Sequence, residues 1–243
     1  MAPLKRILVL GAYGTGNWGD ELILRALSSL LRSAYPQAEL RAFSYDPRLT
    51  ADASGLSTVP IEAYRPLRAV FGHLGRARWR AAAATAREWR EADRALEWAD
   101  LLVLGGGNLL VDDDCYFLEH FTGQVVARAA RRNVPVAVIG VGFGPVRTAR
   151  GRDLLRRLAQ DWACTLAVRE ASARQALEQA GARRVHLIAD PVLLRPPEPV
   201  AARRARPAYG ISARPLPWKA EAASVVEAAV RSLRARGEVI GLP

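Results

Sequence analysis

The chain has few of the residues that cross-link small proteins or bind metals. Its 243 residues include two cysteines, Cys115 and Cys164, and three scattered histidines, His73, His120 and His186. Without paired cysteine spacing or a histidine cluster, the sequence argues against a disulfide framework and a structural zinc site. It also shows no Ser-His-Asp or Cys-His set that would indicate nucleophilic catalysis. We therefore expect a cytoplasmic protein with structural histidines and no metal.

Long hydrophobic runs are also missing. The apolar run at Ile7 to Leu10 is cut by glycine after four residues and followed by acidic residues, so it does not resemble a secretory signal. No later stretch reaches the roughly 18 uninterrupted apolar residues that a membrane helix needs. Half of the residues are nevertheless hydrophobic, enough for a substantial core. The composition predicts a soluble globular protein of one large domain, or one domain and part of another.

The charge is strongly positive but not concentrated. Thirty-five Lys and Arg residues oppose 24 Asp and Glu residues, which gives a formal net charge of +11. Nearly all the basic residues are arginines, spread through alanine-rich segments, and no common nucleic-acid-binding motif occurs. We predict solvated arginines on helix faces and no nucleic-acid partner. Attraction to anionic substrates or to a membrane surface is the alternative.

What the sequence does have, three times, is a buried strand that runs into glycines. The first strand precedes Gly11 to Gly19, the second precedes Gly105 to Gly107, and the third precedes Gly140 to Gly144. In an open parallel sheet the carboxyl ends of the strands share one edge, and ligands bind there. The pattern predicts a Rossmann-like parallel α/β domain whose site lies among these three loops.

The remaining elements follow from periodicity and turn residues. Thr50 to Pro66 lacks periodicity and is expected to be a connecting loop, and Trp79, Trp89 and Trp98 are expected in the core. A linker rich in Pro and Arg over 196–207 separates domain 1–195 from the beginning of a second Rossmann-like domain, 208–243. The other predicted elements are helices over 21–33, 117–132, 171–180 and 219–236, one or two helices within 67–98, strands over 39–44, 165–168, 185–188 and 238–241, and a strand followed by a loop within 208–215.

The first loop has two interpretations. Gly14-Thr15-Gly16-Asn17-Trp18-Gly19 satisfies the dinucleotide fingerprint, with Asp46 near the end of the next strand. The match begins four residues past Leu10, however, and Asp46 lies about thirty residues on instead of about twenty. A nicotinamide or flavin enzyme is therefore only an alternative.

Two further features have a functional and a structural interpretation. Asp112-Asp113-Asp114 could bind a divalent cation, but consecutive carboxylates seldom converge on one ion, so we favour a polar loop. Arg169 follows a strand on the glycine-loop edge, where a guanidinium can hold phosphate or carboxylate bidentately. A salt bridge to Glu170 is the structural alternative. Arg214, after the first strand of the second domain, has the same two interpretations.

Five segments occur together in a specific order. They resemble motifs of the polysaccharide pyruvyl transferase family, and the resemblance covers nearly the whole chain. The segments are Gly11 to Glu21, Gly105-Gly106-Gly107-Asn108-Leu109-Leu110, Gly140-Val141-Gly142-Phe143-Gly144-Pro145, Val168-Arg169-Glu170 and Ala189-Asp190-Pro191, with Gly210 to Pro215 resembling the start of the family's second domain.

The resemblance implies a two-domain fold like that of GT-B glycosyltransferases. It also implies transfer of an enolpyruvyl-derived group from phosphoenolpyruvate to a sugar hydroxyl as a pyruvate ketal, with no cofactor beyond this donor. Such ketals occur on exopolysaccharides and on cell-wall polymers that S-layer proteins recognise. The implied partners are phosphoenolpyruvate and a polysaccharide or lipid-linked glycan, with peripheral association at the inner face of the membrane.

For the site, we expect Arg169 to be the catalytic contact to the donor anion. Glu170 stands where the family more often has Asp, and the chain ends at Pro243, before the family's Arg- and His-bearing segment. We therefore expect a transferase with a truncated second domain, either a truncated gene product, a fragment or half of a split enzyme, whose activity alone is left open. A non-catalytic glycan-binding module is the alternative function. The predicted substrate-binding residues are Gly14, Gly16, Asn17, Gly19, Asp20, Glu21, Gly106, Gly107, Asn108, Gly142, Gly144 and Arg214.

Overall fold

The structure is a computed structural model that describes residues 4–61, 87, 89–112, 122–194, 208–212 and 220–242. The chain divides into two compact units, Met1–Arg195 and Pro196–Pro243. In the second unit, β8 (Ala208–Ser212) and β9 (Glu238–Leu242) pair in parallel and α8 (Ala220–Arg234) connects them, as the sequence predicts.

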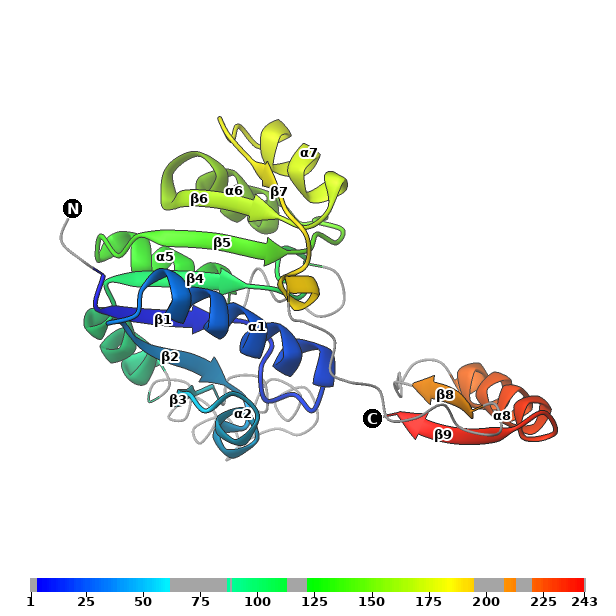
Figure 1. Cartoon of the computed structure of the whole chain (residues 1–243). Coiled ribbons are helices and arrows are strands. Elements are labelled where there is room, and N and C mark those ends of the chain that lie inside the picture. The colour runs from blue at the N-terminus through cyan, green and yellow to red at the C-terminus, as the bar shows by residue number, and fades with distance from the viewer. Residues whose placement is uncertain are drawn as a thin grey trace, which may run out of the picture. The chain divides into compact units, whose positions relative to one another are not determined.

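The first unit is built on a seven-stranded sheet in which every neighbouring pair is parallel (Figure 1). The strand order is β3-β2-β1-β4-β5-β6-β7, so the order reverses between β1 and β4. All carboxyl ends therefore lie on one edge, where the three glycine loops follow β1, β4 and β5. The strands are β1 (Arg6–Leu10), β2 (Glu39–Ser44), β3 (Ser57–Pro60), β4 (Leu101–Gly105), β5 (Val136–Val141), β6 (Ala163–Val168) and β7 (His186–Leu187).

Helices cover both faces of the sheet, with one hydrophobic core on each. Ile7 and Val9 of β1 pack toward Leu24 and Leu27 of α1, which lies in front of the sheet in Figure 1. The alternate residues Leu8 and Leu10 belong to the opposite core, because successive strand residues face opposite ways. The helices are α1 (Trp18–Ala34), α2 (Pro47–Ser54), a helix over 89–98, α5 (Gly123–Arg131), α6 (Ala149–Arg157), the π-helix η2 (Leu158–Trp162), α7 (Ala171–Gln179) and the 3-10 helix η3 (Pro191–Leu194).

The prediction of a connecting loop from Thr50 to Pro66 is wrong, because this stretch contains most of α2 and all of β3. The Asp46 side chain accepts hydrogen bonds from the backbone N–H groups of Arg48 and Leu49, and Pro47 occupies the first turn. Gly55 ends the helix at φ +66°, a left-handed conformation that glycine adopts without strain. Capping residues determine this short helix, and apolar periodicity does not indicate it.

The tryptophan prediction is confirmed where it can be checked. Trp89 and Trp98 are partly buried against the core. The guanidinium of Arg128 lies 4.1 Å from the Trp89 ring centre, and that of Arg41 lies 4.0 Å from the Trp98 ring centre. Arginine therefore covers the outer side of each ring. Trp79 lies outside the described residues.

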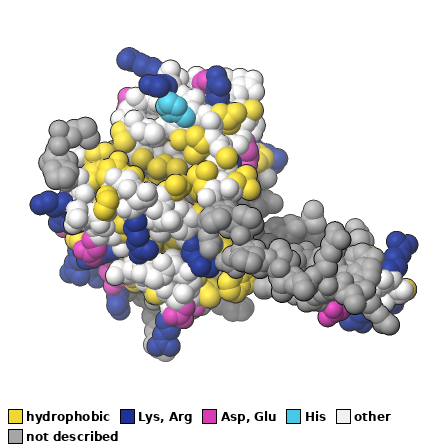
Figure 2. Space-filling view, viewed as in Figure 1, with side chains coloured by type: hydrophobic (Ala, Val, Ile, Leu, Met, Phe, Trp, Pro, Cys, Tyr) yellow, Lys and Arg dark blue, Asp and Glu magenta, His cyan; other side chains and the backbone are white. Residues whose placement is uncertain are grey.

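The surface carries no single basic patch on the face shown in Figure 2. Lys and Arg side chains are scattered over this face, among hydrophobic and uncharged groups. The positive net charge thus does not form one continuous area there. Within the described ranges, no helix combines the length and apolar character needed to cross a bilayer.

Candidate functional site at the carboxyl edge of the sheet

The candidate site lies where the strand order reverses, between the carboxyl ends of β1 and β4. Crossover connections leave these two strands toward opposite faces, and ligands of open parallel sheets bind at such a position. The first loop, residues 11–17, and the second loop, residues 105–108, border this position. The third loop follows β5, the strand next to β4.

Tyr13 fixes the base of the first loop, and the sequence analysis missed this residue. Its buried hydroxyl donates a hydrogen bond of 2.5 Å to the carbonyl oxygen of Gly105, and its own carbonyl accepts from the N–H of Tyr45 at 2.9 Å. Burial first, and then the charges of Asp20 and Glu21, raise the pKa of Tyr13 far above its usual value, so the donor stays protonated. A tyrosine among glycines is the signal that could have identified it.

Glu21, in the first turn of α1, binds the same loop through a hydrogen bond. Its Oε1 accepts a 2.6 Å hydrogen bond from the N–H of Gly14, and the side chain is only 3% exposed. Burial raises the pKa of Glu21, the charges of Asp20 and Asp46 add to this, and hydrogen bonds from Gly14 and Thr50 oppose it. Oε2 is buried and has no hydrogen-bond partner among the described residues. The loop thus rests on a carboxyl group for which ionisation is costly.

The tip of the first loop is exposed. A side chain at Gly16, which has φ +81°, would meet no other atom within 4 Å. Asn17 caps α1, because its Oδ1 accepts from the N–H of Gly19 at 3.1 Å. Its Nδ2 donates to Oδ2 of Asp20 at 2.7 Å. Asn17 and Asp20 therefore hold the tip of the first loop in shape.

Most glycines of the second loop are required by packing against α1. A Cβ atom on Gly105 would collide with Leu27, and one on Gly106 would collide with Ile23. Gly107 differs, since its Cβ position lies 3.2 Å from Oδ1 of Asp20. The second loop thus approaches the first turn of α1 at the Asp20 carboxylate.

The third loop is packed in the same way. A Cβ on Gly142 would collide with Oδ1 of Asn108 and lie 2.8 Å from Oε1 of Glu170, and a Cβ on Gly144 would lie 2.5 Å from Val111. The N–H of Gly142 donates to the carbonyl of Gly107 at 2.8 Å. These predicted substrate-binding glycines have a structural reason to be glycine, and direct substrate contact by them stays a prediction.

Arg169 joins three acceptors at this edge. It donates to Oδ2 of Asp190 at 2.6 Å, to Oδ1 of Asn108 at 3.0 Å and to Oε1 of Glu170 at 3.3 Å. The predicted structural alternative, an ion pair with Glu170, is present. Contact with a donor anion stays a prediction, and the guanidinium already faces two carboxylates. The structure therefore brings Asn108, Asp20 and Arg169 to one rim from three separate segments.

Asp112 has a structural role at the same edge. It is buried and accepts from the N–H of Arg147 at 2.6 Å, the N–H of Thr148 at 3.0 Å and the Thr148 hydroxyl at 2.6 Å. Burial acts to raise the pKa of Asp112, but these hydrogen bonds outweigh it and lower the pKa. The carboxylate thereby anchors the start of α6. Asp113 and Asp114 lie outside the described residues, and no metal-ligand group is found within the described ranges.

Other predicted residues are placed elsewhere or not described. Asp46 caps α2 through its side chain. Its presence is thereby explained by a structural role, whereas the nicotinamide alternative requires this carboxylate to contact a ribose. His186 is exposed on β7, and Cys164 is a free cysteine. Arg214, Cys115, His73 and His120 lie outside the described residues.

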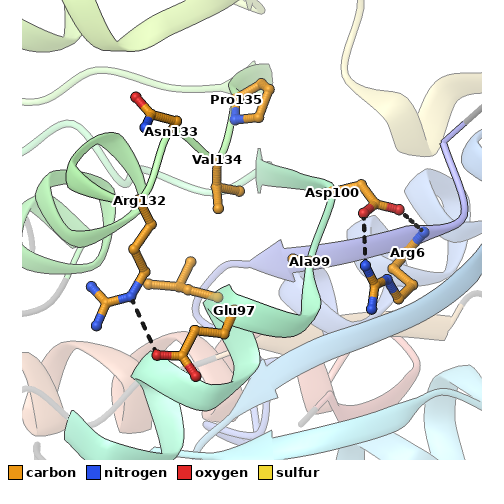
Figure 3. A pocket seen from close by; sticks show the side chains of 9 residues that line it. Arg6, Glu97, Ala99, Asp100, Arg132, Asn133, Val134 and Pro135 are labelled. Carbon is orange, nitrogen blue, oxygen red and sulfur yellow. Dashed lines mark hydrogen bonds and ion pairs between the residues drawn. The ribbon is translucent and has the colours of Figure 1, made fainter. Parts of the chain in front are cut away.

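A depression of about 510 Å³ lies at the opposite, amino-terminal edge of the sheet (Figure 3). It is lined by Arg6 and Asp100, which pair at 3.0 Å, and by Arg132 and Glu97, which lie 3.9 Å apart. Because its charges neutralise one another and it lies away from the strand carboxyl ends, its shape alone does not make it the candidate site.

Comparisons with known proteins bear on the fold and on the family. The chain is similar in structure to Anabaena Alr3699/HepE, solved in complex with UDP-glucose, with a TM-score of 0.53 and 13% identity over 98% of this chain and 69% of that one. This likeness confirms the predicted fold class, Rossmann-like α/β of the GT-B type. Among curated proteins, no sequence matches significantly. A family profile described as polysaccharide pyruvyl transferase matches residues 17–234. The chain therefore belongs to the polysaccharide pyruvyl transferase family.

Proposed function

We propose that this protein takes part in transferring a pyruvyl group from phosphoenolpyruvate to a sugar of a cell-wall or extracellular polysaccharide. The observation that carries the proposal is the rim at the strand-order reversal, where Arg169 contacts Asn108 and the Asp20 carboxylate approaches Gly107, the residue before Asn108. Family membership supports pyruvyl transfer to polysaccharide in general. The specific donor, the ketal product and a lipid-linked acceptor at the inner membrane face are parts of the proposal.

The proposed reaction conserves atoms without a cofactor. Two acceptor hydroxyl oxygens bond to C2 of the donor, and the bond from C2 to the phosphate oxygen breaks. One hydroxyl proton goes to the donor's CH₂ carbon, which becomes a methyl group, and the other goes to the released phosphate. A group that delivers the first proton must lie within hydrogen-bond reach of that carbon. The described rim offers no unpaired histidine or lysine for this step, so we propose that a residue outside the described ranges performs it.

The charge at the rim favours hydroxyl binding over anion binding. Among the residues that the structure describes, Asp20, Glu170 and Asp190 contribute three carboxylates to this rim against the guanidinium of Arg169. Phosphoenolpyruvate carries a phosphate and a carboxylate, which require positive partners or N–H donors. We therefore propose that this rim binds the acceptor.

Phosphate release tests the proposal. The chain is incubated with phosphoenolpyruvate and acceptor glycosides. Acceptor-dependent phosphate release and a ketal methyl signal in the NMR spectrum are expected. UDP-glucose is included among the acceptors because the Anabaena protein was solved with it. No acceptor-dependent release under any of these conditions would contradict the proposal.

A non-catalytic glycan-binding module is the second candidate. It is favoured by the two carboxylates around Arg169, which neutralise the rim's cation. Calorimetry separates the candidates, because this module would bind glycosides without binding phosphoenolpyruvate. Donor binding by the full chain would count against it.

A further inference from the structure

We propose that Asn108 recognises a hydroxyl group of a neutral sugar through its side-chain NH₂, and that Arg169 is the positioning residue that orients this amide. The proposal rests on the proposed function, and it assigns the substrate class and specificity residue of the same rim. It differs from the expectation that Arg169 itself contacts the donor anion.

The first step follows from donor and acceptor chemistry. A guanidinium carries only N–H donors, so an amide that meets it at 3.0 Å must present its oxygen. The Oδ1 atom of Asn108 is thereby fixed toward Arg169, and Nδ2 is turned away from it. The residue is exposed, and Nδ2 has no hydrogen-bond partner within the part of the chain that the structure describes. Two N–H donors are thus exposed at the carboxyl edge of the sheet.

The second step is that the surroundings keep Arg169 in this orientation. The 2.6 Å bond to Asp190 and the 3.3 Å bond to Glu170 hold the guanidinium from two other directions. Asp190 is itself held, since its other oxygen accepts from the N–H of Val192 at 3.0 Å. A planar guanidinium held at several nitrogens loses its rotational freedom, so the amide that it contacts is fixed as well.

The third step concerns the space around the amide. A side chain at Gly142 would collide with Oδ1 of Asn108 and crowd Glu170, so the arrangement requires glycine there. The Gly142 N–H also binds the carbonyl of Gly107, the residue before Asn108. The third glycine loop therefore supports Asn108 through both its backbone and its lack of a side chain.

The fourth step identifies the ligand class. The carboxylate of Asp20 lies next to Gly107, so a hydrogen-bond acceptor and the Asn108 donor flank the same short loop. A sugar hydroxyl both donates and accepts, and it matches such a pair. An anion would face the carboxylates of Asp20, Glu170 and Asp190 at this rim. We therefore assign the rim to a neutral sugar with free hydroxyl groups.

The test replaces the amide by an isosteric carboxylate. Asn108→Asp still accepts from Arg169 but cannot donate, so the fold is kept and the proposed contact is lost. Binding of methyl β-glycosides of galactose, glucose, N-acetylglucosamine and N-acetylmannosamine to the full chain is measured by saturation-transfer NMR. We expect about a tenfold loss of affinity in Asn108→Asp for each glycoside that binds the wild type, as for one lost hydrogen bond.

The matched control is Asn133→Asp, the same change at an exposed asparagine at the opposite edge of the sheet. It should bind glycosides like the wild type, and both variants should melt at the wild-type temperature. Equal losses in the two variants, an unchanged affinity in Asn108→Asp, or no glycoside binding by the wild type would each overturn the proposal.

Arg169 has its own discriminating measurement. Arg169→Ala should weaken glycoside binding and leave the ³¹P NMR titration with phosphoenolpyruvate unchanged, and Arg169→Lys should restore part of the glycoside affinity. Loss of phosphoenolpyruvate binding with intact glycoside binding would assign Arg169 to the donor and overturn its positioning role. Phosphate release is measured in a separate assay. If the variants change glycoside binding as expected but no phosphate is released, the proposed reaction is refuted and this inference is not.

Discussion

Two carboxyl groups at opposite edges of the sheet, Asp100 and Glu21, differ in the charge state that the fold favours. At the amino edge, Arg6 and Asp100 pair at 3.0 Å at the surface, and this hydrogen bond is the largest factor that lowers the pKa of Asp100. At the carboxyl edge, Glu21 is buried, its pKa is raised, and one of its oxygens has no partner within the described residues. The first arrangement favours the charged form of the carboxyl group and the second opposes it.

The candidate site is at the carboxyl edge of the sheet, although the depression described above lies at the amino edge. The amino edge has the depression in Figure 3, but its charges are paired with each other. The carboxyl edge has loops held in left-handed conformations, a carboxyl group that is costly to ionise, and polar groups at an exposed rim. Titratable groups with perturbed pKa values and residues with constrained backbone conformations cluster at functional sites.

The largest expected effect comes from Gly106→Ala. A Cβ there would collide with Ile23, and φ is +67°, so overpacking and backbone strain add. We expect a loss of about 3 kcal/mol or more in the free energy of unfolding. Gly16→Ala, at φ +81° but in open space, is the matched control and should cost only about 1 kcal/mol. Denaturant unfolding that gave equal losses would contradict a role for packing at Gly106.

Asp112→Ala should cause the next largest loss of stability. The change removes three hydrogen bonds and leaves the buried N–H groups of Arg147 and Thr148 without their acceptor. We expect a loss of about 2–3 kcal/mol, measured by thermal and denaturant unfolding near neutral pH. Because the folded pKa of Asp112 is lowered, its contribution is present above the ordinary pKa of 3.8 and is lost as the pH falls through the folded value. If the variant lost the same amount of stability at every pH between 2 and 7, the result would contradict a role for the ionised Asp112 carboxylate.

Glu21→Gln tests the costly carboxyl group directly. The folded pKa is raised, so the protein binds more protons when folded, and its stability falls as the pH rises from about 4.5 through the folded value. Glutamine keeps an oxygen for Gly14 and does not ionise. We expect the variant to gain about 1 kcal/mol relative to the wild type between pH 4 and pH 8. Parallel pH profiles of melting temperature would refute this.

Asp100→Asn is the counterpart at the amino edge and should have the smallest effect. Its carboxylate is favoured in the folded state, so the variant should lose stability at neutral pH and match the wild type in acid. The pair is partly exposed, so about 0.5 kcal/mol is expected. Glycoside binding should not change. The two edges would no longer differ if Glu21→Gln and Asp100→Asn shifted stability in the same direction at pH 8.

The site could be predicted only in part from the sequence. The segments Gly11 to Glu21, Gly105 to Asn108 and Gly140 to Gly144 were identified because glycines directly after apolar strands are typical of binding loops in parallel sheets. The partners of Arg169 could not be found this way, because Asn108 and Asp190 are 61 and 21 residues distant in the chain. Nor could the role of Tyr13, whose acceptor lies 92 residues away.

The sequence by itself determined the parallel strands, the edge on which the loops meet and the family, because these depend on local patterns of apolar residues and glycine. The tertiary structure decided which glycines are needed for packing, which carboxyl group is buried and which amide is oriented by an arginine. Those properties depend on distances between segments far apart in the chain. Burial and hydrogen bonding arise only when the chain brings such segments together.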